Sequence, residues 1–266
     1  MSADARDRAR FVRPRFLRGV ELVSVVYRDR VFPTHMHPEY VVGTVLAGAE
    51  ALRVGGANHV VGAGDVLRLH PGEPHANRCL GAETLRYRVF YLPGENIAPY
   101  LDNAHSLSFA GPVTRDAGLA RLLAATHEAL CQDDIGQLEQ ESALLTLVGA
   151  LAGDPRDDGE PVMSSAAVAR ARDYIDAHFA DAFSLATLAD VARLSVFHLA
   201  HSFRKGTGFS PLAYRNQCRV SEARRLLLAG APIAGVAADV GFADQSHLTR
   251  QFQRIFGVSP GRYAQQ

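Results

Sequence analysis

Three histidines in the N-terminal half have the residue type and the spacing of a metal site or of a polar binding site. His35 and His37 stand two residues apart, and His75 lies on a later segment. Two histidines at i and i+2 on one strand face, joined by a third from a neighbouring strand, suit the coordination of a transition metal. The same side chains could instead hold a small organic molecule or serve only in packing. The residues alone leave these three alternatives open.

Basic and amide side chains near the C-terminus have the chemistry of DNA recognition. Arg250 can pair with O6 and N7 of guanine, and Gln245 can pair with N6 and N7 of adenine. Other basic side chains, such as Arg254, suit the phosphate backbone. Recognition of base edges by these side chains requires a helix that enters the major groove. The residues predicted to face DNA are Phe197, Ala200, His201, Arg204, Lys205, Gln245, Ser246, Thr249, Arg250, Gln253 and Arg254.

An internal repeat predicts the helices that carry these side chains. Each copy has a short helix, a tight turn and a second helix anchored by Leu and Phe at i and i+4, which is the helix-turn-helix plan. Gly241 permits the tight turn of the second copy. Two copies that each end in Gly-x-Ser-Pro, separated by a basic helix, indicate DNA binding rather than an ordinary bundle fragment. The matching residues are Leu199 and Leu248, Phe203 and Phe252, Gly208 and Gly257, Ser210 and Ser259, and Tyr214 and Tyr263.

The segment from about Phe16 to Tyr91 predicts short strands separated by glycine turns. Close spacing without intervening helices favours an antiparallel sandwich or small barrel. The expected strands are Val20–Tyr27, Glu39–Leu46, Ala51–Val54, Asn58–Val61, Asp65–Leu69 and Thr84–Tyr91.

Strand alternation decides which side chains share a face. It places His35, His37 and Glu39 together. On the last expected strand it places Tyr87 and Tyr91 on one face and two arginines on the other. Only one of these two sets can line the interior, and the sequence leaves open which one does.

Helical periodicity begins near Thr114. Apolar residues over Leu119–Leu130 and Leu144–Leu151 predict two trailing helices that close the first domain, with an apolar stripe that could pair with a second subunit. Residues 153–163 are acidic and rich in Pro and Gly, which predicts a linker. The expected fold class is a multidomain α+β protein: a β-barrel domain over residues 1–152 and an all-α domain over residues 164–266.

Composition and charge narrow the class of protein. Hydrophobic residues make up 47% of the chain, without the run of about 18 apolar residues that a membrane helix needs. No signal peptide is visible, and three scattered cysteines form no disulfide framework, so we expect a cytoplasmic protein without a membrane partner. Residues 164–266 carry 12 Arg and Lys against 7 Asp and Glu, a net charge of +5 in a chain whose formal charge is zero. This asymmetry suggests that the C-terminal part meets a polyanion.

The C-terminal repeat resembles the DNA-binding domain of the AraC/XylS family of bacterial transcription regulators. The signature is Gly241-Phe-Ala-Asp-Gln-Ser-His-Leu-Thr-Arg-Gln-Phe-Gln-Arg-Ile-Phe-Gly-Val-Ser-Pro-Gly-Arg-Tyr263, and Leu188–Phe203 is similar to the first copy. The resemblance implies two helix-turn-helix units joined by a helix over Pro211–Ala229, with their second helices in successive major grooves. Ala243 stands where the family often has a capping Ser, which predicts a less well capped second recognition helix. At His201 many members have a longer base-reading side chain.

The histidine segments resemble the two motifs of the cupin barrel, and specifically of the effector domain that precedes an AraC-type reader. The motifs are Thr34-His-Met-His-Pro-Glu39 and Gly64-Asp-Val-Leu-Arg-Leu-His-Pro-Gly-Glu-Pro-His75. Metal-binding cupins usually place a carboxylate shortly after the His-x-His pair, where this chain has Val41 and Val42. Regulators of this type usually bind an organic effector without metal. The resemblance implies an effector site at His35, His37, Glu39, His75, Tyr87 and Tyr91, with no certain cofactor; a divalent metal, if bound, would use His35, His37 and His75.

We therefore expect a ligand-responsive transcription regulator rather than an enzyme. The barrel would sense a small molecule, form a homodimer through Val113–Leu151, and change how the reader meets promoter or operator DNA. RNA polymerase is a further candidate partner. Two alternatives remain: a metal-dependent cupin enzyme with a helical appendage, and a DNA-binding dimer whose barrel is insensitive to ligands.

Overall fold

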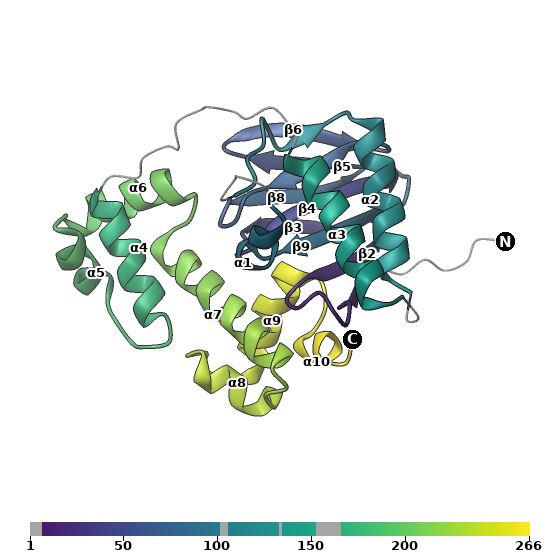
Figure 1. Ribbon diagram of the computed structural model, residues 1–266. Coiled ribbons are helices and arrows are strands. Elements are labelled where there is room, and N and C mark those ends of the chain that lie inside the picture. The colour runs from purple at the N-terminus through teal and green to yellow at the C-terminus, as the bar shows by residue number, and fades with distance from the viewer. Residues whose placement is uncertain (1–6, 102–105, 133–134, 153–165) are drawn as a thin grey trace. The chain divides into compact units, whose positions relative to one another are not determined.

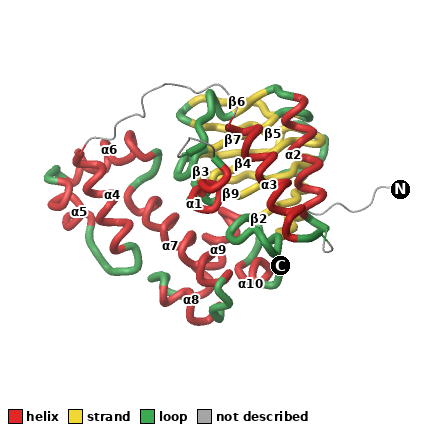
Figure 2. The backbone as a smooth tube through the Cα atoms, in the orientation of Figure 1, coloured by secondary structure: helices red, strands yellow, loops and turns green. Residues whose placement is uncertain are grey.

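The chain divides into a β-rich unit and a helical unit. The computed structural model describes residues 7–101, 106–132, 135–152 and 166–266. One unit consists mainly of residues 7–152 and the other mainly of residues 166–265. The first unit holds two sheets and the second is helical (Figure 1, Figure 2), so the predicted order of a β domain followed by an all-α domain is confirmed. The linker predicted at residues 153–163 lies outside the described residues.

The larger sheet of the first unit has six strands in the order β1-β2-β9-β4-β7-β10. Its strand pairs are antiparallel, as predicted. The bounds are β1 (Arg8–Val12), β2 (Glu21–Tyr27), β4 (Tyr40–Ala47), β7 (Val66–Leu69), β9 (Leu85–Leu92) and β10 (Val113–Thr114).

The smaller sheet has four strands in the order β3-β8-β5-β6. Two of them, β3 and β8, were not among the expected strands, because β3 contains Pro33 and β8 is mostly polar. Arg-rich β1 and two-residue β10 were also missed. The bounds of this sheet are β3 (Val31–His35), β5 (Ala49–Val54), β6 (Ala57–Gly62) and β8 (His75–Leu80).

The larger sheet is buried on both faces. Along β9, Phe90 and Leu92 belong to the apolar cluster that includes the trailing helices α2 (Ala117–Leu130) and α3 (Gln137–Ala152). Tyr91, on the opposite face, has its ring 4.9 Å from that of His37. Two-residue alternation therefore sends one set of side chains toward the helices and the other toward the smaller sheet.

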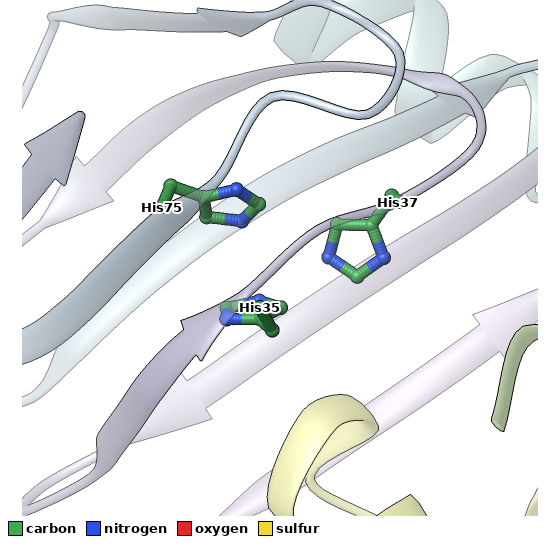
Figure 3. A group of neighbouring side chains, drawn as sticks. All are labelled: His35, His37 and His75. Carbon is green, nitrogen blue, oxygen red and sulfur yellow. The ribbon is translucent and has the colours of Figure 1, made fainter. Parts of the chain in front are cut away.

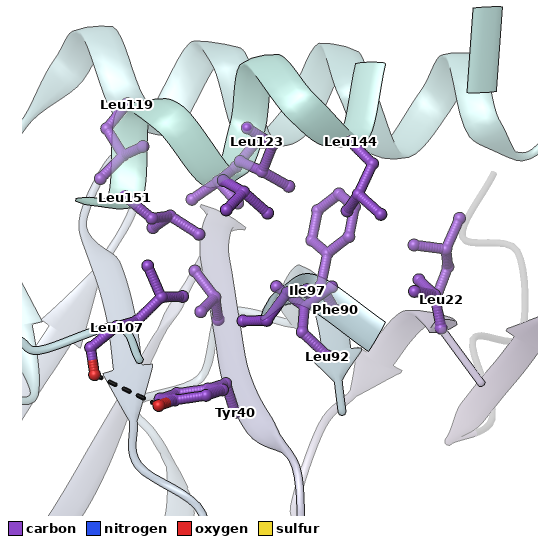
Figure 4. Packing of buried hydrophobic residues seen from close by; sticks show 14 of the residues in the cluster. Leu22, Tyr40, Phe90, Leu92, Ile97, Leu107, Leu119, Leu123, Leu144 and Leu151 are labelled. Atoms are coloured by element: carbon purple, nitrogen blue, oxygen red, sulfur yellow. Dashed lines mark hydrogen bonds between the residues drawn. The ribbon is translucent and has the colours of Figure 1, made fainter. Parts of the chain in front are cut away.

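The apolar stripe of α2 and α3 packs on the domain's own sheet (Figure 4). The stripe that we expected to offer to a second subunit is thus covered within the chain, because the sheet face opposite it is equally apolar. Leu138 (73% exposed) and Leu145 (53% exposed) remain on the outer face of α3. The short helices α1 (Gly94–Ile97) and η1 (Ala98–Tyr100) border the cluster. Its labelled members in Figure 4 are Leu22, Tyr40, Phe90, Leu92, Ile97, Leu107, Leu119, Leu123, Leu144 and Leu151.

The second unit contains two helix-turn-helix pairs, α5–α6 and α8–α9, joined by α7. The predicted helices are confirmed with small changes at their ends, and α10 is additional. No described helix combines the length and apolar composition needed to cross a membrane. The bounds are α4 (Ala166–His178), α5 (Leu185–Ala192), α6 (Val196–Thr207), α7 (Pro211–Leu228), α8 (Ile233–Asp239), α9 (Gln245–Phe256) and α10 (Pro260–Ala264).

Both recognition helices begin with a side-chain cap. The Ser195 hydroxyl accepts a hydrogen bond from the His198 backbone N–H at 3.3 Å, and the Asp244 carboxylate accepts one from the His247 N–H at 2.7 Å. The poor capping that we expected from Ala243 is therefore wrong, because the helix begins one residue later and Asp244 provides the cap.

The arginines of α7 include two that are structural. Arg219 is buried, and its Nε donates to the Phe179 carbonyl oxygen at 2.7 Å. Arg224 is also buried, and its Nε donates to the Tyr263 hydroxyl at 2.7 Å. The joining helix is therefore less of a basic surface than its composition suggested, because these guanidinium groups hold the unit together.

Buried Glu50 and half-buried Asn77 form a polar pair on neighbouring strands β5 and β8. The Asn77 Nδ2 atom donates to Glu50 Oε2 at 2.8 Å. The other carboxylate oxygen, Oε1, has no hydrogen-bond partner among the described residues. Burial raises the pKa of Glu50 to about 7 and outweighs the opposing effect of the Asn77 hydrogen bond.

Gly241 should be essential for packing in the second helix-turn-helix unit. Its φ is +81°, and a Cβ there would overlap backbone atoms of Ala180 and the Arg219 guanidinium. Gly241→Ala should lower the free energy of unfolding by more than about 2 kcal/mol. Gly230→Ala is the matched control, with a φ of +84° and open space around it, and should lose only about 1 kcal/mol. Equal losses in urea unfolding would show that the close approach is unimportant.

Glu50 should make stability depend on pH. Its pKa is raised from 4.5 to about 7, so the folded state binds a proton more tightly than the unfolded state. The wild type should therefore lose stability relative to Glu50→Gln as pH rises through this interval, by roughly 3 kcal/mol in total. Denaturant unfolding of both proteins on either side of the interval measures the difference. A constant difference would contradict the raised pKa.

Candidate DNA-reading helices and candidate histidine site

The two recognition helices each bury one face and expose the other. Leu199 and Phe203 of α6 are fully buried, and so are Leu248 and Phe252 of α9, as the repeat predicted. The opposite face of each helix is consequently open to solvent. Of the residues predicted to face DNA, Ala200 and Thr249 are half-buried and the others are exposed: Phe197, His201, Arg204, Lys205, Gln245, Ser246, Arg250, Gln253 and Arg254.

The exposed faces of α6 and α9 differ in chemistry. Phe197, in the first turn of α6, is 77% exposed, and its neighbour Val196 is 43% exposed. The first turn of α9 instead begins with exposed Gln245 and Ser246, followed by Arg250 one turn later. The first turn of α6 therefore presents an apolar group, and the exposed face of α9 presents hydrogen-bonding groups.

A repeated aromatic contact ties each recognition helix to the helix that follows it. The rings of Phe203 and Tyr214 lie 5.5 Å apart, edge to face, and those of Phe252 and Tyr263 lie 5.3 Å apart in the same manner. The repeated tyrosines noted in the sequence are therefore packing residues. They fix α6 against α7 and α9 against α10.

His35, His37 and His75 come together at the smaller sheet. All three are buried, and one ring nitrogen of each lies within 4.8 Å of those of the other two. The ring centroids of His37 and His75 are 5.3 Å apart. Figure 3 shows the three side chains gathered at the end of β3, in the segment that follows it, and at the start of β8. The three histidines are therefore neighbours, although His37 lies after β3 and not on the strand face that we expected.

Backbone carbonyls orient two of these rings. The Nδ1 of His35 lies 2.8 Å from the Pro33 carbonyl oxygen, and the Nδ1 of His75 lies 2.9 Å from that of Glu73. A carbonyl oxygen only accepts, so each Nδ1 carries the proton and each Nε2 carries the lone pair. Burial lowers the pKa of His75, which favours the neutral imidazole.

Not all of the predicted effector residues join this group. Of the three residues that alternation grouped, only His35 lies on a strand; His37 and Glu39 lie in the segment between β3 and β4. Strand alternation was therefore the wrong reason for grouping them, and Glu39 is absent from the histidine cluster found among the described residues. Tyr91 contacts His37.

The structure answers which face of β9 is turned inward. Tyr87 is half-buried, and its pKa is raised well above the usual value by desolvation and by the nearby charge of Glu50. Tyr87 and Tyr91, rather than the neighbouring arginines, therefore face the smaller sheet. They belong to different polar groups, since Tyr91 lies by His37 whereas Tyr87 lies toward Tyr27 and Glu50.

Sequence reasoning missed Glu50, Asn77 and Tyr27 as interior polar residues. The signal for Glu50 was its alternation with Leu52 and Val54, which are also buried. An acidic residue in an otherwise apolar inward series marks a buried carboxylate.

Two family models match the chain. The AraC-like ligand binding domain matches residues 18–148, and a helix-turn-helix domain matches residues 188–266. The first match covers most of the β-rich unit with α2 and most of α3, and the second contains both recognition helices.

Relatives are found over most of the chain. The uncharacterized HTH-type transcriptional regulator YbfI of Bacillus subtilis strain 168 is 28% identical over 225 residues, which cover 82% of this chain and 81% of that protein. The arabinose operon regulatory protein of Escherichia coli K12 is 28% identical over 242 residues, which cover 84% of this chain and 80% of that protein.

Solved structures share the fold. The crystal structure of ToxT from Vibrio cholerae O395 matches with a TM-score of 0.54 and 15% identity, covering 91% of this chain and 96% of that one. At this identity the likeness establishes the fold alone. Both domain models and both relatives, however, describe transcription regulators and not enzymes. The chain belongs to the AraC family of DNA-binding transcription regulators, with a ligand-binding domain before its helix-turn-helix domain.

Proposed function

We propose that the protein reads two short elements of duplex DNA with α6 and α9, and that its β-rich domain senses a small molecule that alters this reading. The observation that carries the first part is the open, chemically distinct face of each recognition helix. Both helices belong to one compact unit and pack with α7. Helices that enter successive major grooves on one side of DNA read elements about one helical turn, roughly 34 Å, apart.

The proposed contacts with DNA are of two kinds, contacts with base edges and contacts with backbone phosphates. Arg250 and Gln245 suit purine edges in the groove of α9, and Phe197 suits the thymine methyl group in the groove of α6. Arg204, Lys205 and Arg254 lie in the C-terminal halves of the two helices and suit backbone phosphates. His201, Ser246 and Thr249 complete the proposed interface.

The sensing role rests on the interior of the β-rich domain. Polar side chains of both sheets meet between them, with the histidines and Tyr91 in one group and Glu50, Asn77 and Tyr87 in another. Buried polar groups of this kind orient a small ligand. Among the structural neighbours, one ToxT structure has an unsaturated fatty acid bound. Glu39 is the peripheral member of the proposed effector site.

A homodimer is part of the proposal, with RNA polymerase as a further partner. Because the apolar stripe of α2 and α3 is covered by the sheet, pairing would have to use the outer face of α3, where Leu138 and Leu145 are exposed. The alternative is a DNA-binding dimer whose β-rich domain is insensitive to ligands. A ligand that binds the folded state must raise the melting temperature, so a metabolite screen by thermal shift separates the two.

Selection of randomised duplexes by the whole protein, at controlled salt, tests the proposal. Recovery of two elements about one helical turn apart would support it. Binding without sequence preference that disappears as salt rises would overturn it, because only a basic helical unit would remain.

Arg250 and Arg254 should differ in what they contribute. Arg250→Ala should relax base preference at one position and cost about 1–3 kcal/mol of binding free energy there. Arg254→Ala should weaken binding to all DNA sequences alike and reduce the dependence of affinity on salt concentration. Repeating the selection and a salt titration with each variant measures both effects. An unchanged sequence preference for Arg250→Ala would refute its role in base reading.

Phe197 should read the thymine methyl group. Replacing one thymine of the selected α6 element by uracil removes that methyl, which should reduce wild-type affinity about fourfold, the equivalent of roughly 0.8 kcal/mol. Phe197→Ala should bind both duplexes equally. Uracil placed outside the element is the control. If both proteins lose the same affinity on uracil substitution, another residue makes the contact.

A further inference from the structure

We propose that Arg193, in the turn between α5 and α6, binds a backbone phosphate of DNA at the edge of the major groove that α6 enters. The turn consists of residues 193–195 and leads directly into Val196, the first residue of α6. The inference rests on the DNA reading proposed above. It adds a contact outside the recognition helices, at a residue that the sequence pattern did not indicate.

The backbone of Arg193 has a conformation that favours glycine. Its φ is +57° and its ψ is +46°, which lie in the left-handed region. Among the residues that the structure describes, every other positive φ belongs to a glycine. In this region the Cβ atom comes too close to the following carbonyl oxygen. Arginine therefore makes this turn less stable than glycine would.

The second helix-turn-helix pair has glycine at the equivalent position. Buried Leu188 and Val236 occupy the same place in α5 and α8, and each is followed at the same spacing by the left-handed residue, Arg193 or Gly241. In the second pair, the close approach of neighbouring backbone requires glycine. In the first pair the Arg193 side chain is exposed, so the turn has room for it. A strained arginine where glycine would fit indicates a use for the side chain.

The Arg193 side chain is not needed to hold the turn. The backbone N–H of Arg193 donates to the Asp190 carbonyl oxygen at 3.0 Å. The last two carbonyl groups of α5 accept hydrogen bonds from the Arg170 guanidinium of α4, at 3.3 and 2.7 Å. These contacts satisfy the C-terminal end of α5, where a helix leaves carbonyl groups without partners of its own. The use of the Arg193 side chain therefore lies outside the turn.

The Arg193 guanidinium makes no hydrogen bond, ion pair or ring contact with the residues that the structure describes, and it is exposed. Two other arginines of the same unit differ from it in this respect. Arg170 donates to α5, and Arg172 lies 3.6 Å from the Asp173 carboxylate. A guanidinium without a partner keeps all of its N–H donors for a ligand. Its planar fork matches the oxygens of a phosphate in shape as well as in charge.

The place of Arg193 in the chain decides which part of DNA it meets. A recognition helix enters the major groove with its N-terminal residues against the bases. The turn before that helix then lies at the edge of the groove, along which the phosphates run. Val196 and Phe197, which begin α6, are exposed and apolar. Arg193 therefore supplies a cation, and with it a phosphate contact, at the end of α6 where these two residues supply none.

The test compares Arg193→Gly with the wild type in the whole protein, on the duplex recovered by selection. Relief of strain should raise the midpoint of urea unfolding, whereas loss of a phosphate contact should lower DNA affinity. One contact contributes a salt slope of about 0.9, so the loss should be about fifteenfold at about 50 mM salt and about fourfold at about 200 mM. Sequence preference should not change, because a phosphate contact carries no base information.

Two further substitutions separate the charge from the backbone. Arg193→Asn tolerates the left-handed conformation but lacks the charge, so its DNA affinity and salt slope should match those of Arg193→Gly. Arg193→Lys keeps the charge and should retain most of both. Arg172→Gln is the matched control, because it removes one exposed charge from the same unit at a residue already paired with Asp173. It should leave the salt slope unchanged.

Three results would overturn the role of Arg193. These are an unchanged affinity and salt slope in Arg193→Gly, an equal loss in Arg172→Gln, and a fall in both stability and affinity in Arg193→Gly, which would indicate a structural role. If selection with the wild type recovers no preferred sequence, the proposed DNA reading fails instead. The salt slopes of the wild type and Arg193→Gly on a random duplex then still decide whether Arg193 contacts a phosphate.

Discussion

The geometry of the DNA-reading surface depends on how α7 is held between the two helix-turn-helix units. Arg219 donates to Phe179, the first residue after α4, and Arg224 donates to Tyr263 near the C-terminus. Each guanidinium also lies over an aromatic ring, that of Phe242 at 5.6 Å and that of Phe256 at 5.3 Å. A helix held by buried contacts at its middle and in its C-terminal half cannot slide or rotate freely. The spacing between α6 and α9 is therefore a property of buried contacts rather than of the surface that meets DNA.

In the β-rich unit the corresponding constraint is the period of two along each strand. On β9 it turns Phe90 and Leu92 toward α2 and α3, and Tyr87 and Tyr91 toward the smaller sheet. A one-residue change of register would exchange the two sets and leave arginines in the interior. Apolar packing on one side of the sheet thus fixes the polar groups on the other. The histidine cluster depends on the same register, because Tyr91 packs against His37.

Much of this could be predicted from the sequence. The repeated Leu and Phe anchors located both recognition helices because a buried stripe at helical spacing leaves a strong periodic signal. Strand β3 was missed because it contains Pro33, and β8 was missed because its composition is polar. The pairing of such strands is decided by their neighbours in the sheet and not by their own sequence. The roles of Glu50 and Arg219 depend on contacts between distant segments, which local pattern cannot reveal. The same limit explains why the capping prediction at Ala243 was wrong. Helix α9 begins one residue later than expected, so Asp244 and not Ala243 is its capping residue.

The choice of cap gives the two recognition helices ends of different electrical character. The partial positive charge at a helix N-terminus attracts anions, and a neutral cap such as Ser195 leaves that attraction in place. The Asp244 carboxylate at the start of α9 cancels much of it. A phosphate that approaches α9 end-on meets a negative group, whereas one that approaches α6 meets a favourable dipole. The second helix-turn-helix pair therefore depends more than the first on its side chains, and on the bases that they contact, to bind DNA.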